Sequence, residues 1–227
     1  MAYRPTARTR ANAQQRRLSI ESAARHVIAR GGFAAASVAA VAREAECSTG
    51  LIYTYYANRD ELLRAVFARA SGHELAVIET AVAQASTAAA IAESVAEVFV
   101  RRAVTGRRLA HALLFEEVPD AVQLERLILR RGYVASVAAG LDRASGHSHP
   151  VRAGAESPSA AGGAARDVST VPAEVAARFI VGGIAENLVD VLDPTTPPPR
   201  PDEIEALISA LSAFTRSALG SDPLGEK

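Results

Sequence analysis

Apolar residues recur every three or four positions along most of the chain, which is the spacing of one face of an α-helix. The first such pattern ends at Gly31-Gly32. Two short patterns follow Ser37 and Ser48, residues suited to cap a helix, and a long one follows Asn58. The opening third of the chain is therefore expected to fold as one long, two short and one further long helix.

Further helices are expected over residues 87–104, 107–117, 120–144, 173–192 and 201–219. Two stretches between them lack apolar periodicity. Residues 145–170 are rich in Gly, Ala, Ser and Pro and are expected to form a long mobile loop, and the proline-rich residues 193–201 a stiff connector. The pattern predicts an all-α protein.

Composition supports a helical chain and adds an asymmetry of charge. Apolar residues make up 49% and aromatic residues 5%, and alanine is the strongest helix former. The net charge is zero, but residues 1–70 hold eleven Arg against five Asp or Glu, whereas residues 71–227 hold fourteen basic and twenty acidic residues. A basic segment beside an acidic body suggests a polyanion partner for the first segment, although a solvated arginine-rich tail is also compatible.

Several classes of protein fit the sequence poorly. The single cysteine, Cys47, allows no disulfide within the chain, and no window approaches the roughly 18 apolar residues of a membrane span. The basic start has no apolar run behind it, so we expect no signal peptide and a cytoplasmic protein. Cys47 is expected to be a small buried thiol rather than a redox switch. His147 and His149 lie without acidic or cysteine partners, so no metal site is expected.

The domain organisation follows from these patterns. Residues 1–14 are expected to be a disordered basic tail, 15–67 a helix-turn-helix unit, 68–219 a helical body and 220–227 a tail. The last helix of a helix-turn-helix lies in the major groove of DNA. The stretch from Ser48 to Tyr55 is short and rich in small polar groups, as such a helix requires.

Residues 20–67 also resemble the DNA-binding domain of TetR/AcrR-type transcriptional regulators. The motifs that carry the resemblance are Ile20-Glu21-Ser22-Ala23-Ala24, Gly32-Phe33, Ser37, Val41-Ala42, the stretch from Ala45 to Tyr53, Tyr55-Tyr56, and Asn58-Arg59-Asp60-Glu61-Leu62-Leu63. The chain departs from the family pattern at Glu46, where a turn glycine is usual, at Arg59, where lysine is usual, and at Glu21, which replaces leucine and is expected to be exposed. A positive φ at Glu46 would cost about 1–2 kcal/mol.

The resemblance implies that the first domain contacts DNA. The candidate DNA-binding residues are Ser37, Ser48, Thr49, Gly50, Tyr53, Thr54, Tyr55 and Arg59. Thr49, Tyr53 and Arg59 are expected to hold phosphates, and Gly50 and Thr54 to lie near base edges. Ser48 is expected to act mainly as a helix cap. The basic stretch from Arg4 to Arg17 either reaches neighbouring DNA or stays solvated.

Beyond residue 70 the resemblance is one of architecture: helices that enclose an effector pocket, then two that pair with a second subunit. The candidate pocket residues are Phe99, Arg102, His111, Phe115, Tyr133, Phe179 and Asn187, which suit a mostly apolar ligand with a few polar anchors. The segment 173–192 is apolar around almost its whole circumference and therefore needs a partner on one side. The candidate dimer residues are Phe179, Gly182, Gly183, Leu188, Leu207, Leu211 and Phe214.

The sequence therefore predicts a DNA-binding transcriptional regulator rather than an enzyme, since no catalytic constellation or cofactor motif is present. The expected partners are double-stranded DNA carrying a palindromic operator, a second copy of the chain, and an unidentified small-molecule effector that releases a repressor from DNA. A regulator without a ligand and a small helical enzyme are the alternatives.

Overall fold

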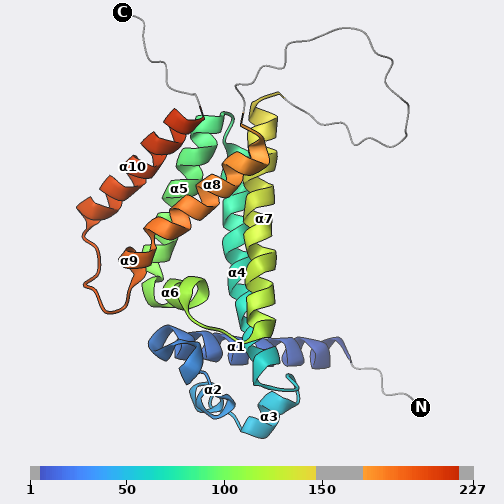
Figure 1. The fold of residues 1–227 in the computed structure, drawn as a ribbon. Helices are drawn as coiled ribbons and strands as arrows, with labels where there is room; N and C mark the ends of the chain where they lie inside the picture. The colour runs from blue at the N-terminus through green and yellow to red at the C-terminus, as the bar shows by residue number, and fades with distance from the viewer. Residues whose placement is uncertain (1–5, 147–170, 220–227) are drawn as a thin grey trace, which may run out of the picture.

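The computed structural model describes residues 6–146 and 171–219, and every regular element in these two ranges is a helix (Figure 1). The helices are α1 (Ala7–Ala35), α2 (Val38–Glu44), α3 (Thr49–Tyr53), α4 (Arg59–Gln84), α5 (Ala88–Thr105), α6 (Arg107–Phe115), α7 (Asp120–Ala144), α8 (Ala173–Asn187), α9 (Val189–Leu192) and α10 (Pro201–Ala218). The predicted all-α fold is confirmed over this part of the chain. No helix in it combines the length and the apolar character needed to cross a membrane.

The head of the molecule consists of α1, α2, α3 and the start of α4. One side of each of these helices packs into a common core. The largest fully buried side chains in this core are Ile20, Ile28, Phe33, Ile52, Leu62, Leu63 and Phe67. Ala112 of α6 and Val122 of α7 are also fully buried in this core. The head is therefore completed by residues far along the chain.

The body consists of the rest of α4 with α5, α6, α7, α8, α9 and α10. In Figure 1, α4 and α7 stand side by side above α1, and α8 crosses in front of them. A second core fills the space between these helices, with Ile91, Val95, Val137, Leu188 and Leu192 almost fully buried. The helix α4 carries buried residues of both cores and so joins head to body as one continuous rod.

Three boundaries differ from expectation. The first helix begins at Ala7, so residues 7–14 are helical rather than part of a disordered tail; Thr6 caps the helix by accepting from Thr9 N–H (3.2 Å). The predicted helix 173–192 is interrupted at Leu188, where the Asn187 side chain donates to the Gly183 carbonyl (2.8 Å) and competes with the backbone for it. The helix expected over 107–117 ends at Phe115.

Other boundaries agree with the sequence. The predicted break at Gly31-Gly32 is present, because both residues leave the helical conformation inside α1. Most of the loop expected over 145–170, with His147 and His149, and the tail expected over 220–227 lie outside the described residues.

Candidate functional site

The turn between α2 and α3 fixes how α3 is presented. Ser37 accepts from Ala40 N–H and Ser48 accepts from Leu51 N–H, each at 3.1 Å, so both serines cap their helices as expected. Glu46, in the turn, has φ +50°, the left-handed conformation that usually calls for glycine. Glu46 therefore carries a backbone strain of about 1–2 kcal/mol at a position where the family pattern has a glycine.

The helix α3 is anchored on one side and exposed on the other. Ile52 is 1% exposed and fixes the helix to the core of the head, while Thr49, Gly50, Tyr53 and Thr54 are exposed. The Tyr53 side chain is 55% exposed although it is aromatic. The helix α3 lies at the lower end of the molecule in Figure 1. Its exposed side carries small polar residues and Tyr53, which suits insertion into a DNA groove.

Arg59 and Tyr55 are engaged within the head. The Arg59 guanidinium donates to the carbonyls of Ala36 (Nε, 3.0 Å) and Phe33 (Nη2, 2.5 Å). Tyr55 is half-buried, its carbonyl accepts from Arg17 Nη2 (3.2 Å), and the Arg17 guanidinium lies 5.9 Å from the centre of its ring. Arg59 was expected to face phosphates, but two of the five N–H groups of its guanidinium are engaged by the carbonyls between α1 and α2.

Glu21 is buried rather than exposed, which corrects the expectation. It is 7% exposed, accepts from the Tyr56 hydroxyl (2.8 Å) and forms an ion pair with Arg69. Burial and the neighbouring Glu21 carboxylate raise the pKa of Tyr56 above its usual value, so the hydroxyl stays a donor. This network ties α1 to α4 where the family pattern has an apolar contact.

A cavity of about 400 Å³ lies in the body, between α4, α5, α6, α7 and α8. Its lining is mainly apolar, with Phe67, Ile78, Val98, Phe99, Leu109, Leu113, Leu114, Phe115, Leu129 and Val181 among the contributing residues. A volume of this size is within the range of small-molecule sites.

A few polar groups interrupt the apolar lining. Arg102 forms a two-pronged ion pair with Glu74, with Nη2 and Oε1 at 2.7 Å. The buried Tyr133 ring meets Phe99 edge-on, with centroids 5.5 Å apart, and burial raises the pKa of its hydroxyl. Ser71 is also buried at the wall. These groups could orient a mostly apolar ligand.

Four of the expected pocket residues line this cavity, namely Phe99, Arg102, Phe115 and Tyr133. The other three do not. His111 lies beside Glu116 (Nδ1 to Oε1, 3.8 Å), Phe179 is 74% exposed, and the exposed Asn187 donates to its own helix. Helical spacing alone did not show which side of α6 and α8 faces inward. Nor did it single out Ser71 and Glu74, whose part of α4 was assigned no pocket role.

Residues 20–66 match the family model for bacterial regulatory proteins of the tetR family. The match covers α2, α3 and the adjoining parts of α1 and α4, so the head carries a TetR-type DNA-binding segment. The chain is a DNA-binding transcription regulator. No curated protein sequence matches the chain significantly.

Solved structures resemble the chain over nearly its whole length. The regulator FadR from Bacillus subtilis, in complex with stearoyl-CoA, is 19% identical with a TM-score of 0.64, over 87% of this chain and 96% of that one. FadR from Bacillus halodurans is 17% identical with a TM-score of 0.63, over 87% and 96%. A TetR-like regulator from Rhodococcus sp. RHA1 is 16% identical with a TM-score of 0.60, over 96% and 100%. At these identities the likeness establishes the fold.

The helix α6 stands between the cavity and the head. One side of α6 lines the cavity, and on the other side Ala112 is fully buried in the core of the head. Just after α6, Glu116 Oε2 accepts from the Phe33 N–H (2.8 Å), and Arg126 of α7 donates to the Glu116 carbonyl (3.0 Å). Gly32 has φ +73°, and a Cβ there would lie 2.5 Å from Glu116 Oε2. The cavity wall and the DNA-binding head are therefore in direct contact.

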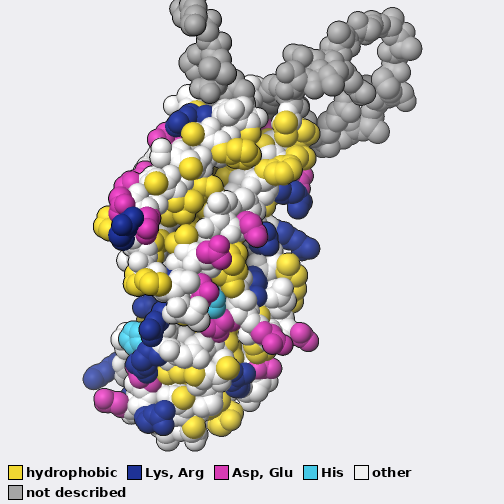
Figure 2. Space-filling model, turned by 60° about the vertical axis from the view of Figure 1, so that its left-hand side comes forward, with side chains coloured by type: hydrophobic (Ala, Val, Ile, Leu, Met, Phe, Trp, Pro, Cys, Tyr) yellow, Lys and Arg dark blue, Asp and Glu magenta, His cyan; other side chains and the backbone are white. Residues whose placement is uncertain are grey.

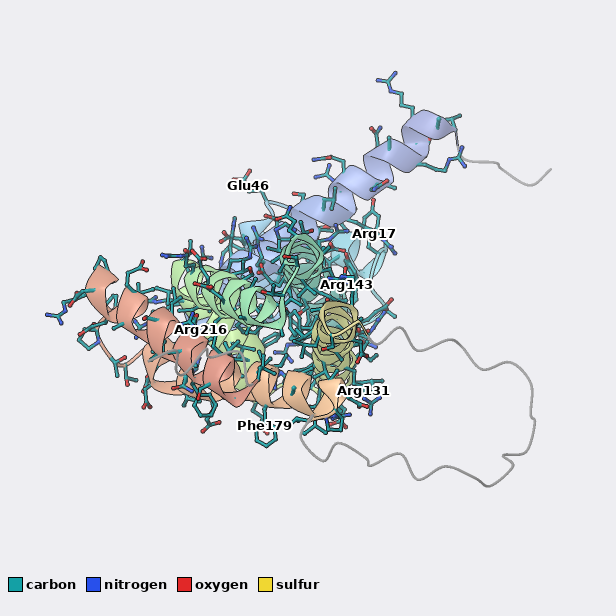
Figure 3. All side chains as sticks on the ribbon, turned by 90° about the horizontal axis from the view of Figure 1, so that it is seen from above. Arg17, Glu46, Arg131, Arg143, Phe179 and Arg216 are labelled. Atoms are coloured by element: carbon teal, nitrogen blue, oxygen red, sulfur yellow. The ribbon has the colours of Figure 1, made fainter. Side chains whose placement is uncertain are left out.

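The body also presents exposed apolar side chains on α8 and α10. Phe179 is 74% and Phe214 71% exposed, and Val175 and Val189 are also exposed. In Figure 3, Phe179 points away from the rest of the molecule, and in Figure 2 hydrophobic side chains are conspicuous over the upper part of the visible face. Large aromatic side chains at this exposure make α8 and α10 the candidate interaction surface of the described residues.

The other expected dimer residues are placed differently. Leu188 is fully buried in the core of its own subunit, so its assignment to an interface is corrected. Gly182 lines the cavity, whereas a Cβ at Gly183 would meet open space. Leu207 and Leu211 are half-buried against the body core. Leu188 follows Val181 by seven and Ile184 by four residues, so it shares the buried side of α8.

Proposed function

We propose that the chain is a homodimeric repressor that binds a palindromic DNA operator and is released when a small apolar molecule occupies its cavity. The observation that carries the proposal is the contact of α6 with both the cavity and the head. A ligand that changes the position of α6 must change the environment of the DNA-binding head.

The DNA-binding step is assigned to α3. Thr49 and Tyr53, at its two ends, hold phosphates, and Gly50 and Thr54 lie where base edges are read. Arg17 is added to this surface, because it donates to the Tyr55 carbonyl beside the end of α3. Arg59 acts mainly by holding α1 and α2 in place for α3.

Dimerisation is assigned to the exposed face of α8 and α10. Pairing of two such faces about a two-fold axis buries Phe179 and Phe214 of both subunits. Two heads related by this axis require an operator with two inverted half-sites, whose spacing matches the distance between the two α3 helices.

Release follows from a shift between two populations. Ligand binding in the cavity favours the arrangement of α6 that fits the ligand, and the Glu116 contact to Phe33 N–H passes that preference to the head. The cavity suits a mostly apolar ligand with one polar anchor. The Bacillus subtilis FadR structure contains stearoyl-CoA, which joins an apolar acyl chain to a large polar group, and this compound belongs among those tested.

The DNA step is tested with the full chain. A random-sequence duplex library is put through rounds of selection on the purified protein, and affinity for the recovered duplex is compared with that for a scrambled one. Specific, salt-sensitive binding that Tyr53→Ala weakens more than Tyr53→Phe supports the proposal. Equal affinity for both duplexes contradicts it, because sequence would then not be read.

The release step is tested with the probe 1-anilinonaphthalene-8-sulfonate, an apolar ring system with an anionic anchor. Ala110 lines the cavity, so Ala110→Phe should abolish probe binding, whereas Ala139→Phe, exposed on α7, should not. Bound probe and stearoyl-CoA should each lower operator affinity. A probe that binds in the cavity and leaves operator affinity unchanged would favour a regulator without ligand control.

A further inference from the structure

The N-terminal part of α1, residues 7–19, extends beyond the head as a helical arm. Every residue of the arm is exposed except Ala13 and Leu18, which are half-buried, and the first buried residue of α1 is Ile20. Figures 1 and 3 show this end of α1 projecting beyond the head, with nothing packed on its far end. The arm is thus a preformed feature that packing within the described chain does not explain.

The arm carries positive charge and no negative charge. It contains Arg8, Arg10, Arg16 and Arg17, and there is no Asp or Glu before Glu21. Among the described residues, Arg8, Arg10 and Arg16 form no ion pair or side-chain hydrogen bond. A helix that is polar all round and lacks intrahelical ion pairs needs another reason to be present. Its charge is complementary to a polyanion.

One side of the arm continues the DNA-binding surface of the head. Residues seven apart lie on the same side of a helix, so Arg10 shares the side of Arg17. Arg17 is fixed beside the end of α3 through the Tyr55 carbonyl (3.2 Å). Arg10 therefore stands on the α3 side, about 10 Å further out along the arm, whereas Arg8 lies on roughly the opposite side.

The arm also points away from the apolar face. In Figure 3, Phe179 lies on one side of the molecule and the N-terminal end of α1 extends toward the other. In a dimer that pairs the α8 and α10 faces, the two arms would extend outward, each beyond the outer edge of its own head.

From this placement we propose that the arm holds the sugar–phosphate backbone of duplex DNA outside the operator half-sites, through the side that bears Arg10 and Arg17. Guanidinium groups bind phosphate by two parallel hydrogen bonds, and such contacts do not depend on base sequence. A reach of about 10 Å corresponds to roughly three base pairs beyond the half-site, at 3.4 Å per base pair. The inference rests on the proposed DNA-binding function and extends the stretch of DNA that the protein contacts.

The test compares two duplexes that carry the same selected operator. One ends at the outer edges of the half-sites and the other continues on both sides with flanks of arbitrary sequence. The full-length wild type should bind the flanked duplex more tightly and with a steeper dependence of log affinity on log salt. Arg10→Ala should remove most of this difference, flattening the slope on the flanked duplex by about 0.9 per subunit, or about 1.8 for a dimer.

Two controls remove the same charge elsewhere. Arg8→Ala tests the opposite side of the arm, and Arg131→Ala tests an exposed position on α7 in the body; both should leave the slope within error of the wild type. Equal effects of Arg8→Ala and Arg10→Ala, or no advantage of the flanked duplex, overturn the inference while leaving operator binding intact. Absence of specific binding to either duplex would instead overturn the proposed function on which it rests.

Discussion

The head and the body of this molecule are specified in different ways. In the head, single residues set the ends of short helices: Ser37 and Ser48 cap α2 and α3, and Gly32 adopts a conformation that other residues avoid. In the body, long alanine-rich helices pack through many interchangeable apolar contacts. Short-range signals of this kind are matched by a family model over residues 20–66, whereas the body is matched only as a fold, by structures that are 16–19% identical.

The two regions are nonetheless not independent units. Ala112 and Val122, from α6 and α7, are fully buried in the core of the head. A body produced without residues 1–69 would expose the side of α6 that they cover. Ligand and DNA affinities are therefore best measured on the full chain.

The largest expected effect concerns the proposed dimer interface on α8 and α10, which would set the spacing of the two heads. Phe179→Glu places a charge on the most exposed aromatic of α8 and should convert dimers to monomers. A buried anchor residue contributes about 2 kcal/mol or more, and a two-fold interface holds two copies, so the dimer should weaken about a thousandfold. Sedimentation measures the mass, and circular dichroism should show unchanged helicity.

Leu124→Glu is the matched control, since Leu124 is 59% exposed on α7, away from α8 and α10. It should leave the dimer intact. A Phe179→Glu variant that stays dimeric would place the interface elsewhere and remove the basis for two paired heads.

The sequence predicted the head almost completely because its signals are local. Helix caps, a turn and an Ile-x-x-Ala-Ala pattern are readable over a few residues. It failed where a side chain meets a distant segment. Glu21 is buried only because Tyr56 and Arg69 reach it, and the Glu116 contact to Phe33 spans 83 residues. In the body, periodicity located the helices but did not fix their rotation, so three of the seven expected pocket residues lie off the cavity, and Leu188 and Gly182 of the expected interface face inward.

The second prediction probes the junction between the two regions. Gly32→Ala should lower the free energy of unfolding by about 2–3 kcal/mol, because alanine is strained at φ +73°, ψ −179° and its Cβ would meet the Glu116 carboxylate. Urea unfolding of the full chain measures the loss. A neutral effect would mean that Glu116 can leave the junction without cost and that it does not couple head to body.

The third prediction separates two roles of Arg59. Because its guanidinium donates to the Phe33 and Ala36 carbonyls and is partly exposed, Arg59→Ala should destabilise the protein by about 1–2 kcal/mol. Arg59→Lys should recover part of this, since an ammonium group cannot reproduce the planar fork. The salt slope of DNA binding should barely change. A slope reduced by about 0.9 per subunit with stability unaltered would show that Arg59 holds phosphate instead.

The smallest effect concerns the rod that joins the two regions. Gly72 lies in α4 between the residues buried in the head, such as Phe67, and those buried in the body, such as Ile78, and a Cβ there meets open space. Alanine loses less backbone entropy on folding than glycine and is the better helix former. Gly72→Ala should therefore raise the free energy of unfolding by about 0.5–1 kcal/mol, in a single transition and with operator affinity unchanged. This outcome would mean that α4 stays straight in both the DNA-binding and the released state, so that α6 carries the signal. If the variant binds the operator as before but is no longer released by a cavity ligand, α4 bends at Gly72 during release, and the head and body communicate through the rod as well as through α6.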